Sequence, residues 1–400
     1  MRDHVKSEIQ GRIIGHRGST WRAVVSEHGS LHPSDGSPVL DWYIAADDRW
    51  YTPAKEPTTR QKWYSGYPVS ETRVKVPGGD VIQRIYSIAD LGGMTVIDFE
   101  NDSPMPIAIA VTRSDLFTVR APSDNPPQGI DLPSGSIVLP VGHKSSTRVA
   151  LAHRNPTQGR LPEDTATYQQ AVRGWETACD KASRINVPDH TVVAGVSRVR
   201  SDLLLGVGAG PDAAIELARL GETHRDSIID VVECVQRRFK QEKRARTLAW
   251  DTPHVISSAA RACVLLGDDV AANDIAHAWL RLADRAVAEP PVAVPEGLAS
   301  ISWIETLLAS PSPSGGECRL LPYGIPEPWW GASFEAHGLT ADAHRTIGYA
   351  VRWHGARPAL LWEVQGAPGL LLSHGEGDEQ WHTTDASGEA LLPAPQHTHA

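Results

Sequence analysis

The sequence predicts a multidomain β + α protein with three parts. An antiparallel β-sandwich is expected over residues 1–160, a central α-helical hairpin array over 161–310 and a small C-terminal β segment over 311–400. The main observation is the spacing of apolar residues, which recurs at three and four positions within residues 163–308 and alternates as in strands elsewhere. The second observation is that proline- and glycine-containing stretches flank the helical part.

The N-terminal part contains many short apolar runs separated by turn residues. In residues 95–100, Ile97 and Phe99 fall on one face and acidic residues on the other. Residues 107–111 alternate in the same way, and stretches rich in Gly, Pro and Asn separate these runs. Such alternation is typical of half-buried antiparallel strands, so we expect two packed sheets.

The middle part carries the apolar stripes of helices that bury one face. Three such stripes run over residues 192–203, 228–239 and 275–286. Asp and Pro precede the stripes and Gly follows them, as expected for helix ends. Ser302 and Glu305 have the spacing of a capping box at the start of the last helix. We therefore expect six or seven helices, and their short connections favour antiparallel hairpins packed side by side.

The C-terminal part returns to strand-like patterns. A Ser-, Pro- and Gly-rich stretch over residues 310–316 ends the helical pattern and predicts a linker. Short apolar runs at 346–353 and 359–364 have the length of strands. A small sheet is expected here, followed by a disordered tail over residues 396–400.

Composition and charge limit the classes of partner. The net charge of -10 argues against a general nucleic-acid or anionic-membrane surface. The basic run over residues 237–246 is interpreted as the solvated end of a helix. No apolar run approaches the roughly 18 residues of a membrane helix, and we expect a cytoplasmic protein. The four cysteines lack the paired spacing of a zinc site, so neither a metal nor another cofactor is expected.

Several stretches carry a resemblance to a known superfamily. They are SETRVKVPGGD at 70–80 with QRIY at 83–86, then residues 185–189, 199–205 and 349–363. These stretches resemble parts of the six-hairpin glycosidase superfamily, which includes glucoamylase-like, glycogen-debranching-like and uncharacterised actinobacterial proteins. The resemblance implies a β-sandwich followed by a helical toroid. Six or seven helices are about half of a closed toroid, so either the ring is shortened or further helices are present.

The resemblance also implies the hydrolysis of α-linked glucosides by two carboxyl groups, one acting as acid and the other as base or nucleophile. Candidates are carboxylates near helix N-termini, because such ends line the mouth of a helical toroid. Asp251 beside Trp250 and Glu305 close to Trp303 meet this condition. The alternative interpretation is structural, with Asp251 as a helix N-cap and Glu305 as the second half of the capping box.

A second candidate group lies in the C-terminal part, where a tandem Trp pair precedes Glu335 and His337. Tryptophan offers a flat apolar face and one N–H donor, which suits the stacking of a sugar ring. Glu335 is therefore a third catalytic candidate. The candidate substrate-binding residues are Trp250, Trp303, Trp329, Trp330 and His337. The tandem pair could instead seal the C-terminal sheet onto the helices.

Two functions are consistent with this sequence. The first is a glycoside hydrolase acting on α-linked glucosides, and the second is a catalytically inactive relative that binds carbohydrate or a protein partner. A closed pocket with two opposed carboxylates would distinguish them. No nucleotide-binding, serine-hydrolase or zinc-protease motif is found in the sequence, and nothing in it predicts the oligomeric state.

Overall fold

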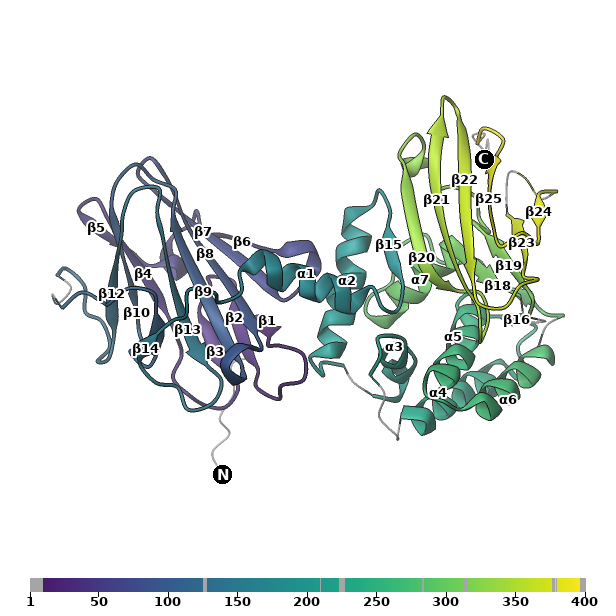
Figure 1. Ribbon diagram of the computed structural model, residues 1–400, viewed down its shortest axis with the longest axis horizontal. Coiled ribbons are helices and arrows are strands. Elements are labelled where there is room, and N and C mark those ends of the chain that lie inside the picture. The colour runs from purple at the N-terminus through teal and green to yellow at the C-terminus, as the bar shows by residue number, and fades with distance from the viewer. Residues whose placement is uncertain are drawn as a thin grey trace. The chain divides into compact units, whose positions relative to one another are not determined.

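In the computed structural model, the chain forms two compact units, Met1–Trp175 and Glu176–Ala400 (Figure 1). Each unit is described by itself. The structure describes residues 10–124, 128–208, 210–222, 227–282, 284–312, 315–375, 378 and 380–395. The predicted tail at 396–400 lies outside these residues. None of the described helices has the length and apolar character needed to cross a membrane.

The described residues of the first unit form three sheets. Their strand orders are β1-β2-β3, β12-β10-β4-β5 and β14-β11-β13-β9-β8-β7-β6. All of these neighbours pair antiparallel except β11 and β14, which run parallel. The strands are β1 Gly11–Ile14, β2 Ala23–Ser26, β3 Leu31–Pro33, β4 Trp42–Ala46, β5 Arg49–Tyr51, β6 Arg60–Trp63, β7 Val69–Val76, β8 Gly79–Ile88, β9 Met94–Asn101, β10 Ile107–Val111, β11 Phe117–Thr118, β12 Ile137–Val141, β13 Ser146–Ala152 and β14 Gly159–Arg160.

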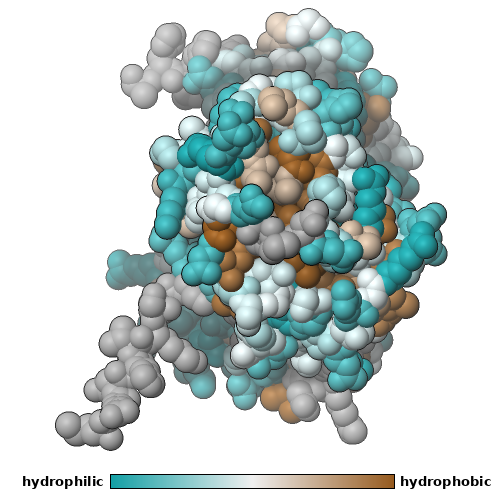
Figure 2. Space-filling model, turned by 90° about the vertical axis from the view of Figure 1, so that its left-hand side faces the viewer, coloured by the Kyte–Doolittle hydropathy of each residue, from teal (hydrophilic) through white to brown (hydrophobic). Residues whose placement is uncertain are grey.

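One hydrophobic core joins the sheets of the first unit. Ile97 and Phe99 of β9 are buried in it together with Ile109 and Val111 of β10, which belong to different sheets. The inward faces predicted for these residues are therefore confirmed, and the two larger sheets pack as in a sandwich. The face of the molecule in Figure 2 is mostly hydrophilic, with hydrophobic residues showing in several separate places.

The second unit combines helices with three sheets. The sheet orders are β15-β20-β21-β22-β25, β18-β19-β23-β24 and β16-β17. The strands are β15 Arg184–Asn186, β16 Thr247–Leu248, β17 Ala286–Val287, β18 Ala309–Pro311, β19 Glu317–Leu320, β20 Phe334–Thr340, β21 Thr346–His354, β22 Arg357–Gln365, β23 Leu371–His374, β24 His382–Thr383 and β25 Ser387–Leu391. The helices are α2 His190–Leu204, α3 Ala214–Arg219, α4 Ser227–Glu242, α5 Thr252–Leu265, α6 Asp269–Leu280 and α7 Leu298–Leu308, while α1 Tyr168–Cys179 crosses the division between the units.

The predicted helical hairpin array, and with it the toroid, is wrong. The described part of the second unit is a mixture of helices and sheets. Helix α7 buries Ile304 and Leu308 in the same core as Tyr349 and Leu360 of the sheet, while α3 to α6 form a separate core around Trp279. The apolar stripe of α7 is thus covered by strands as well as by α2, whose Val192 and Val196 lie in the same core. The spacing of Ser302 and Glu305 predicted a helix here but not the elements that cover it.

Two predictions concern the end of the helical part, the domain boundary and the capping box. The predicted boundary at residue 310 lies inside the second unit, because β18 pairs antiparallel with β19 across the Ser-, Pro- and Gly-rich stretch. Helix α7 begins at Leu298, so Ser302 and Glu305 lie within it and the predicted capping box is wrong. The N-cap of this helix is Gly297, whose φ of 61° is in the left-handed region that favours glycine.

Candidate functional site

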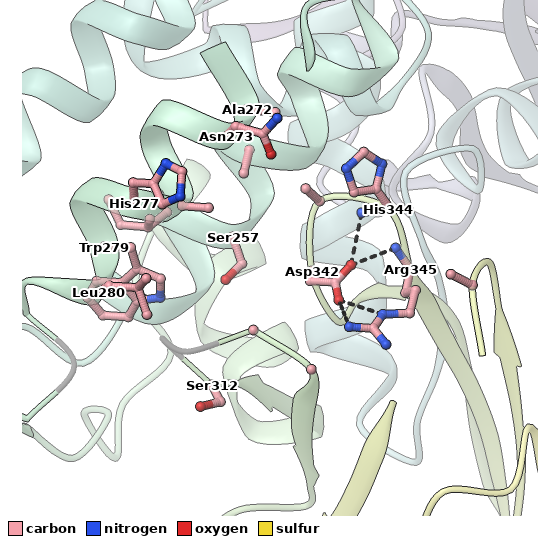
Figure 3. A pocket seen from close by; sticks show the side chains of 17 residues that line it. Ser257, Ala272, Asn273, His277, Trp279, Leu280, Ser312, Asp342, His344 and Arg345 are labelled. Carbon is pink, nitrogen blue, oxygen red and sulfur yellow. Dashed lines mark hydrogen bonds and ion pairs between the residues drawn. The ribbon is translucent and has the colours of Figure 1, made fainter. Parts of the chain in front are cut away.

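A cavity of about 540 Å³ lies in the second unit between α5, α6 and the turn that joins β20 to β21. Figure 3 shows Asn273, His277 and Trp279 on one side of it, Asp342 and His344 on the other, and Ser257 between. Most of the surface of its wall is apolar, and its hydrogen-bonding side chains are Ser257, Asn273, His277, Trp279, Ser312, Asp342, His344 and Arg345. This is the usual composition of a small-molecule site, and the volume falls within the usual range of roughly 300 to 1,000 Å³.

Helix α6 supplies the polar rim of this cavity. The helix starts at Asp268, whose carboxylate accepts a hydrogen bond from the Ala271 backbone N–H at 2.8 Å. Its buried stripe includes Trp279, which faces the core of α3 to α6. Asn273 and His277 lie beside that stripe, are exposed, and are four residues apart. Both side chains therefore lie on one face of the helix at the mouth of the cavity.

Trp279 provides a buried donor in the cavity wall. The residue is 3% exposed, and its indole N–H has no hydrogen-bond partner among the described residues. Burying a donor without a partner costs about 1 to 3 kcal/mol, so such groups are rare in folded proteins. A ligand with an acceptor atom in the cavity would remove this cost.

The turn opposite α6 is held in place by Asp342. Its carboxylate accepts hydrogen bonds from the backbone N–H groups of His344 and Arg345, each at 2.9 Å. It also accepts from the Arg345 side-chain Nε at 2.6 Å. Asp342 is the one carboxylate among the described residues that line this cavity, and its acceptor capacity is used within the turn.

Asp251 occupies the N-cap position of α5, but its side chain does not cap the helix. The carboxylate instead accepts two hydrogen bonds from the Arg238 guanidinium, at 2.8 and 2.7 Å. Bidentate pairs of this kind are strong and favour the ionised carboxylate. Asp251 lines a second, smaller cavity of about 180 Å³.

Glu305 lies in the interior of the second unit and is 1% exposed. It accepts hydrogen bonds from the Ser183 hydroxyl at 2.6 Å and from Arg200 at 3.0 Å, and both of its oxygens accept from Arg219, at 2.9 and 2.8 Å. Burial alone would raise the pKa of Glu305, but Arg219, His254 and Arg200 lower it to about 2. Glu305 is therefore ionised at neutral pH and is not a protonated general acid.

His254 and Ser258 lie next to Glu305 in the order of an acid–base–nucleophile chain. The His254 Nδ1 is 3.6 Å from the carboxylate, and its Nε2 is 3.5 Å from the Ser258 hydroxyl. Both distances exceed the roughly 2.6 to 3.2 Å over which proton transfer is efficient. Ser258 is only 1% exposed, in the middle of α5, and burial lowers the pKa of His254. This arrangement does not support serine-hydrolase chemistry.

Glu335 and His337 lie on β20, away from Asp251 and Glu305 in the chain but close to each other. The carboxylate of Glu335 pairs with Arg184 at 2.8 Å and with Arg352 at 3.2 Å. The His337 Nε2 is 4.0 Å from the same carboxylate. Both nominated side chains are partly exposed, and Glu335 is held by two cations.

The nominated tryptophans use their rings and N–H groups in packing. Trp329 is buried at 5% exposure against Phe334, with the ring centroids 5.3 Å apart. The N–H groups of Trp330 and Trp303 each donate to a backbone carbonyl at 2.8 Å. Trp250 is partly buried against the core that contains Trp329. Among the described residues, the N–H groups of Trp330 and Trp303 are therefore already bound, whereas the N–H of Trp279 has no partner.

The structure thus groups the nominated residues in two places, and none of them lines the 540 Å³ cavity. Asp251 lines the smaller cavity, and Glu305 lies directly behind its wall. Glu335 and His337 form the other group. Trp279 was assigned only to a buried stripe, and a polar pair four residues apart beside that stripe, Asn273 and His277, is the sequence signal that could have indicated the cavity.

Comparison with known proteins gives no family. No protein-family model matches the chain, and no curated protein matches it significantly. The resemblance to six-hairpin glycosidases therefore stays an untested prediction, and the function is argued from the cavity alone.

Proposed function

We propose that the second unit binds a neutral carbohydrate in the 540 Å³ cavity without hydrolysing it. The observation that carries this proposal is the buried indole N–H of Trp279, which lacks a partner among the described residues and lies in the cavity wall. A hydroxyl or ring oxygen of a sugar would accept this hydrogen bond.

The composition of the wall supports this class of ligand. A sugar ring presents apolar C–H faces together with many hydroxyl groups that both donate and accept hydrogen bonds. The apolar residues of α5 and α6 can cover the C–H face, while Asn273, His277 and Ser257 can bond the hydroxyls at the rim. The cavity offers no unpaired charge among its described carboxylates, which favours a neutral ligand.

Hydrolysis is not supported at this site. It requires two carboxyl groups on opposite sides of the scissile bond. Asp342 is the one carboxylate in the described wall, and it already accepts hydrogen bonds from Arg345 and two backbone N–H groups. The binding function therefore fits the geometry better than the hydrolase that the sequence also predicted.

The test is titration of the protein with a panel of monosaccharides and α- and β-linked disaccharides, followed by calorimetry. We expect at least one neutral sugar to bind, and Trp279→Phe to weaken its binding about 10-fold, because the change removes one hydrogen bond and keeps most of the ring. The matched control is Trp303→Phe, since the Trp303 N–H already donates to Pro291. Absence of sugar binding, or equal affinity in the wild type and Trp279→Phe, would contradict the proposal, whereas release of free sugar would favour the hydrolase.

A further inference from the structure

Basic residues are concentrated where helices α4 and α6 end. Residues 240–246 and 281–285 together carry six cationic side chains, which are Lys240, Lys243, Arg244, Arg246, Arg281 and Arg285. All of them except Arg285 are exposed, and Arg285 is half-buried. We call these six residues the basic patch. None of them lines the cavity of the proposed carbohydrate site, so the patch is a separate feature of the second unit.

The two basic segments are brought together by β16 and β17. These strands pair in parallel, with Thr247 opposite Ala286, and each strand directly follows one of the segments. The Arg285 guanidinium also reaches the end of α4, where it donates to the backbone carbonyls of Glu242 at 2.7 Å and Ala245 at 3.0 Å. The cations of both segments therefore share one part of the surface, although about 40 residues separate them in the chain.

The usual role of cations at a helix C-terminus is already filled at α4 by Arg285. Such cations are stabilising because they bind the last carbonyl groups and complement the helix dipole. Arg285 binds these carbonyls, whereas Lys243, Arg244 and Arg246 form no hydrogen bond or ion pair with other residues that the structure describes. These three cations are therefore free to pair with a second molecule.

Carboxylates within the two segments do not balance the cations. The segments contain two of them, Glu242 and Asp284. Glu242 is 5% exposed, and its carboxylate accepts hydrogen bonds from the Ala249 N–H at 3.2 Å and the Thr252 hydroxyl at 3.0 Å. Asp284 is the one exposed carboxylate among the described residues of the two segments. An excess of exposed cations of this kind produces a positive potential at the surface, which attracts an anionic partner.

The charge of the rest of the chain limits the length of that partner. The chain as a whole has a net charge of -10, and without the six cations of the patch the remainder is more negative still. A DNA duplex carries a negative charge at roughly every 1.7 Å of its length, so it would extend beyond the patch onto this acidic remainder and be repelled. A short acidic segment of a protein would contact the cations alone.

We propose that the basic patch binds a short acidic segment of a partner protein, with carboxylates of the partner paired to Lys243, Arg244 and Arg246. Arginine suits this ligand, because a guanidinium group holds a carboxylate through two parallel hydrogen bonds. The ion pairs would be open to solvent, so each is weak, and the affinity depends on several pairs and on the salt concentration. The proposal goes beyond carbohydrate binding and does not depend on it.

The experiment measures binding of a fluorescent acidic peptide to the full chain by fluorescence anisotropy. The probe is a peptide of about ten residues in which Glu and Ala alternate, with both ends blocked, and the control peptide has Gln in place of Glu. We expect the Glu peptide alone to bind, and its Kd to rise about 10-fold between about 50 and about 200 mM salt. Absence of binding at the lower salt concentration, or equal affinity for the Gln peptide, would overturn the proposal. Tighter binding of a DNA duplex of about 20 base pairs would also overturn it and would assign the patch to nucleic acid.

Two double variants with the same change of net charge isolate the patch. The first, Lys243→Glu with Arg244→Glu, reverses two charges within it. The matched control, Lys75→Glu with Arg154→Glu, reverses two exposed charges of the first unit. None of these side chains pairs with another described residue, so both variants should fold. We expect the first variant to weaken binding of the Glu peptide at least about 10-fold and the control less than about 2-fold. Equal weakening would show that the peptide responds only to net charge, which would contradict a defined site.

Discussion

Glu305 and Trp279 are both buried polar side chains of the second unit, and they differ in how their hydrogen-bonding groups are used. Glu305 accepts from Ser183, Arg200 and Arg219, and it has no cavity of its own. The Trp279 N–H has no partner among the described residues, and Trp279 lines a cavity. The contrast is between a saturated charged cluster, which holds helices together, and a neutral donor without a partner, which is the basis of the proposed ligand site.

The largest expected effect is the loss of the Glu305 charge. Glu305→Gln leaves Arg200 and Arg219 buried with fewer acidic partners, which should lower the free energy of unfolding by roughly 3 to 5 kcal/mol. Trp279→Phe should lower it less, by about 1 to 2 kcal/mol, because the lost N–H makes no bond and only the difference in ring volume is left unfilled. Urea unfolding followed by circular dichroism measures both values. Similar losses of unfolding free energy in the two variants would contradict the proposed difference between Glu305 and Trp279.

The first unit shows that an open nitrogen alone does not make a site. The His153 Nδ1 also has no partner among the described residues, but Gly93 fills the space beside it. A Cβ at Gly93 would lie 2.8 Å from that nitrogen and 2.6 Å from the His16 Nε2, at a φ of +103°.

Gly93→Ala should therefore cost more than the roughly 1 to 3 kcal/mol of backbone strain. The matched control is Gly92→Ala, because Gly92 has a φ of +84° and no atom near its missing Cβ. The difference between the two melting temperatures measures the clash with the histidines. Equal melting temperatures would show that the space beside His153 is not closed.

Acidification should destabilise the protein through His153, because the folded protein keeps this buried ring neutral. Burial, His16 and Arg22 lower the pKa of His153 from 6.5 to about 3. The unfolded chain then binds more protons than the folded chain, so the contribution of neutral His153 is present above pH 6.5 and is lost as the pH falls through 3. In His153→Gln the melting temperature should fall less between pH 6.5 and 3 than in the wild type. An unchanged pH profile would contradict this.

The smallest expected effect is at Glu335, whose ion pairs are on the surface. Its partners Arg184 and Arg352 have side chains that are 50% and 45% exposed, so solvent and salt screen both interactions. Glu335→Gln should lower the free energy of unfolding by less than about 1 kcal/mol. Urea unfolding at low and at high salt measures this value. A loss comparable to that of Glu305→Gln would show that exposure does not separate the two clusters.

The sequence predicted those features that depend on neighbouring residues. Alternation located the inward face of residues 95–100 and 107–111, and both are buried as expected. Periodicity also located the buried face of α6 at Ile275 and Trp279, although the predicted stripe continued to residue 286 and the helix ends at Leu280. These patterns report which side of an element is covered, because the period of a helix or strand is fixed by its backbone.

Features that depend on distant pairing could not be predicted in this way. The cluster around Glu305 joins side chains from four parts of the second unit, and nothing in the spacing of Arg200, Arg219 and Glu305 indicates that they meet. The same is true of the cavity near Trp279, whose opposite wall is a turn more than 60 residues later, at Asp342. Local spacing therefore nominated Glu305 without revealing its partners.

The strand β15 has a consequence for the order of folding. Its three residues pair with β20, where Arg184 lies opposite His337 and Asn186 opposite Glu335, about 150 residues later in the chain. Such long-range pairing closes a large loop and slows folding. During synthesis, β15 therefore cannot pair until β20 has been made. The helices between these strands are synthesised before the sheet that packs on α7 can form. A ribosome-bound chain that ends near residue 310 should expose that apolar face and bind chaperones.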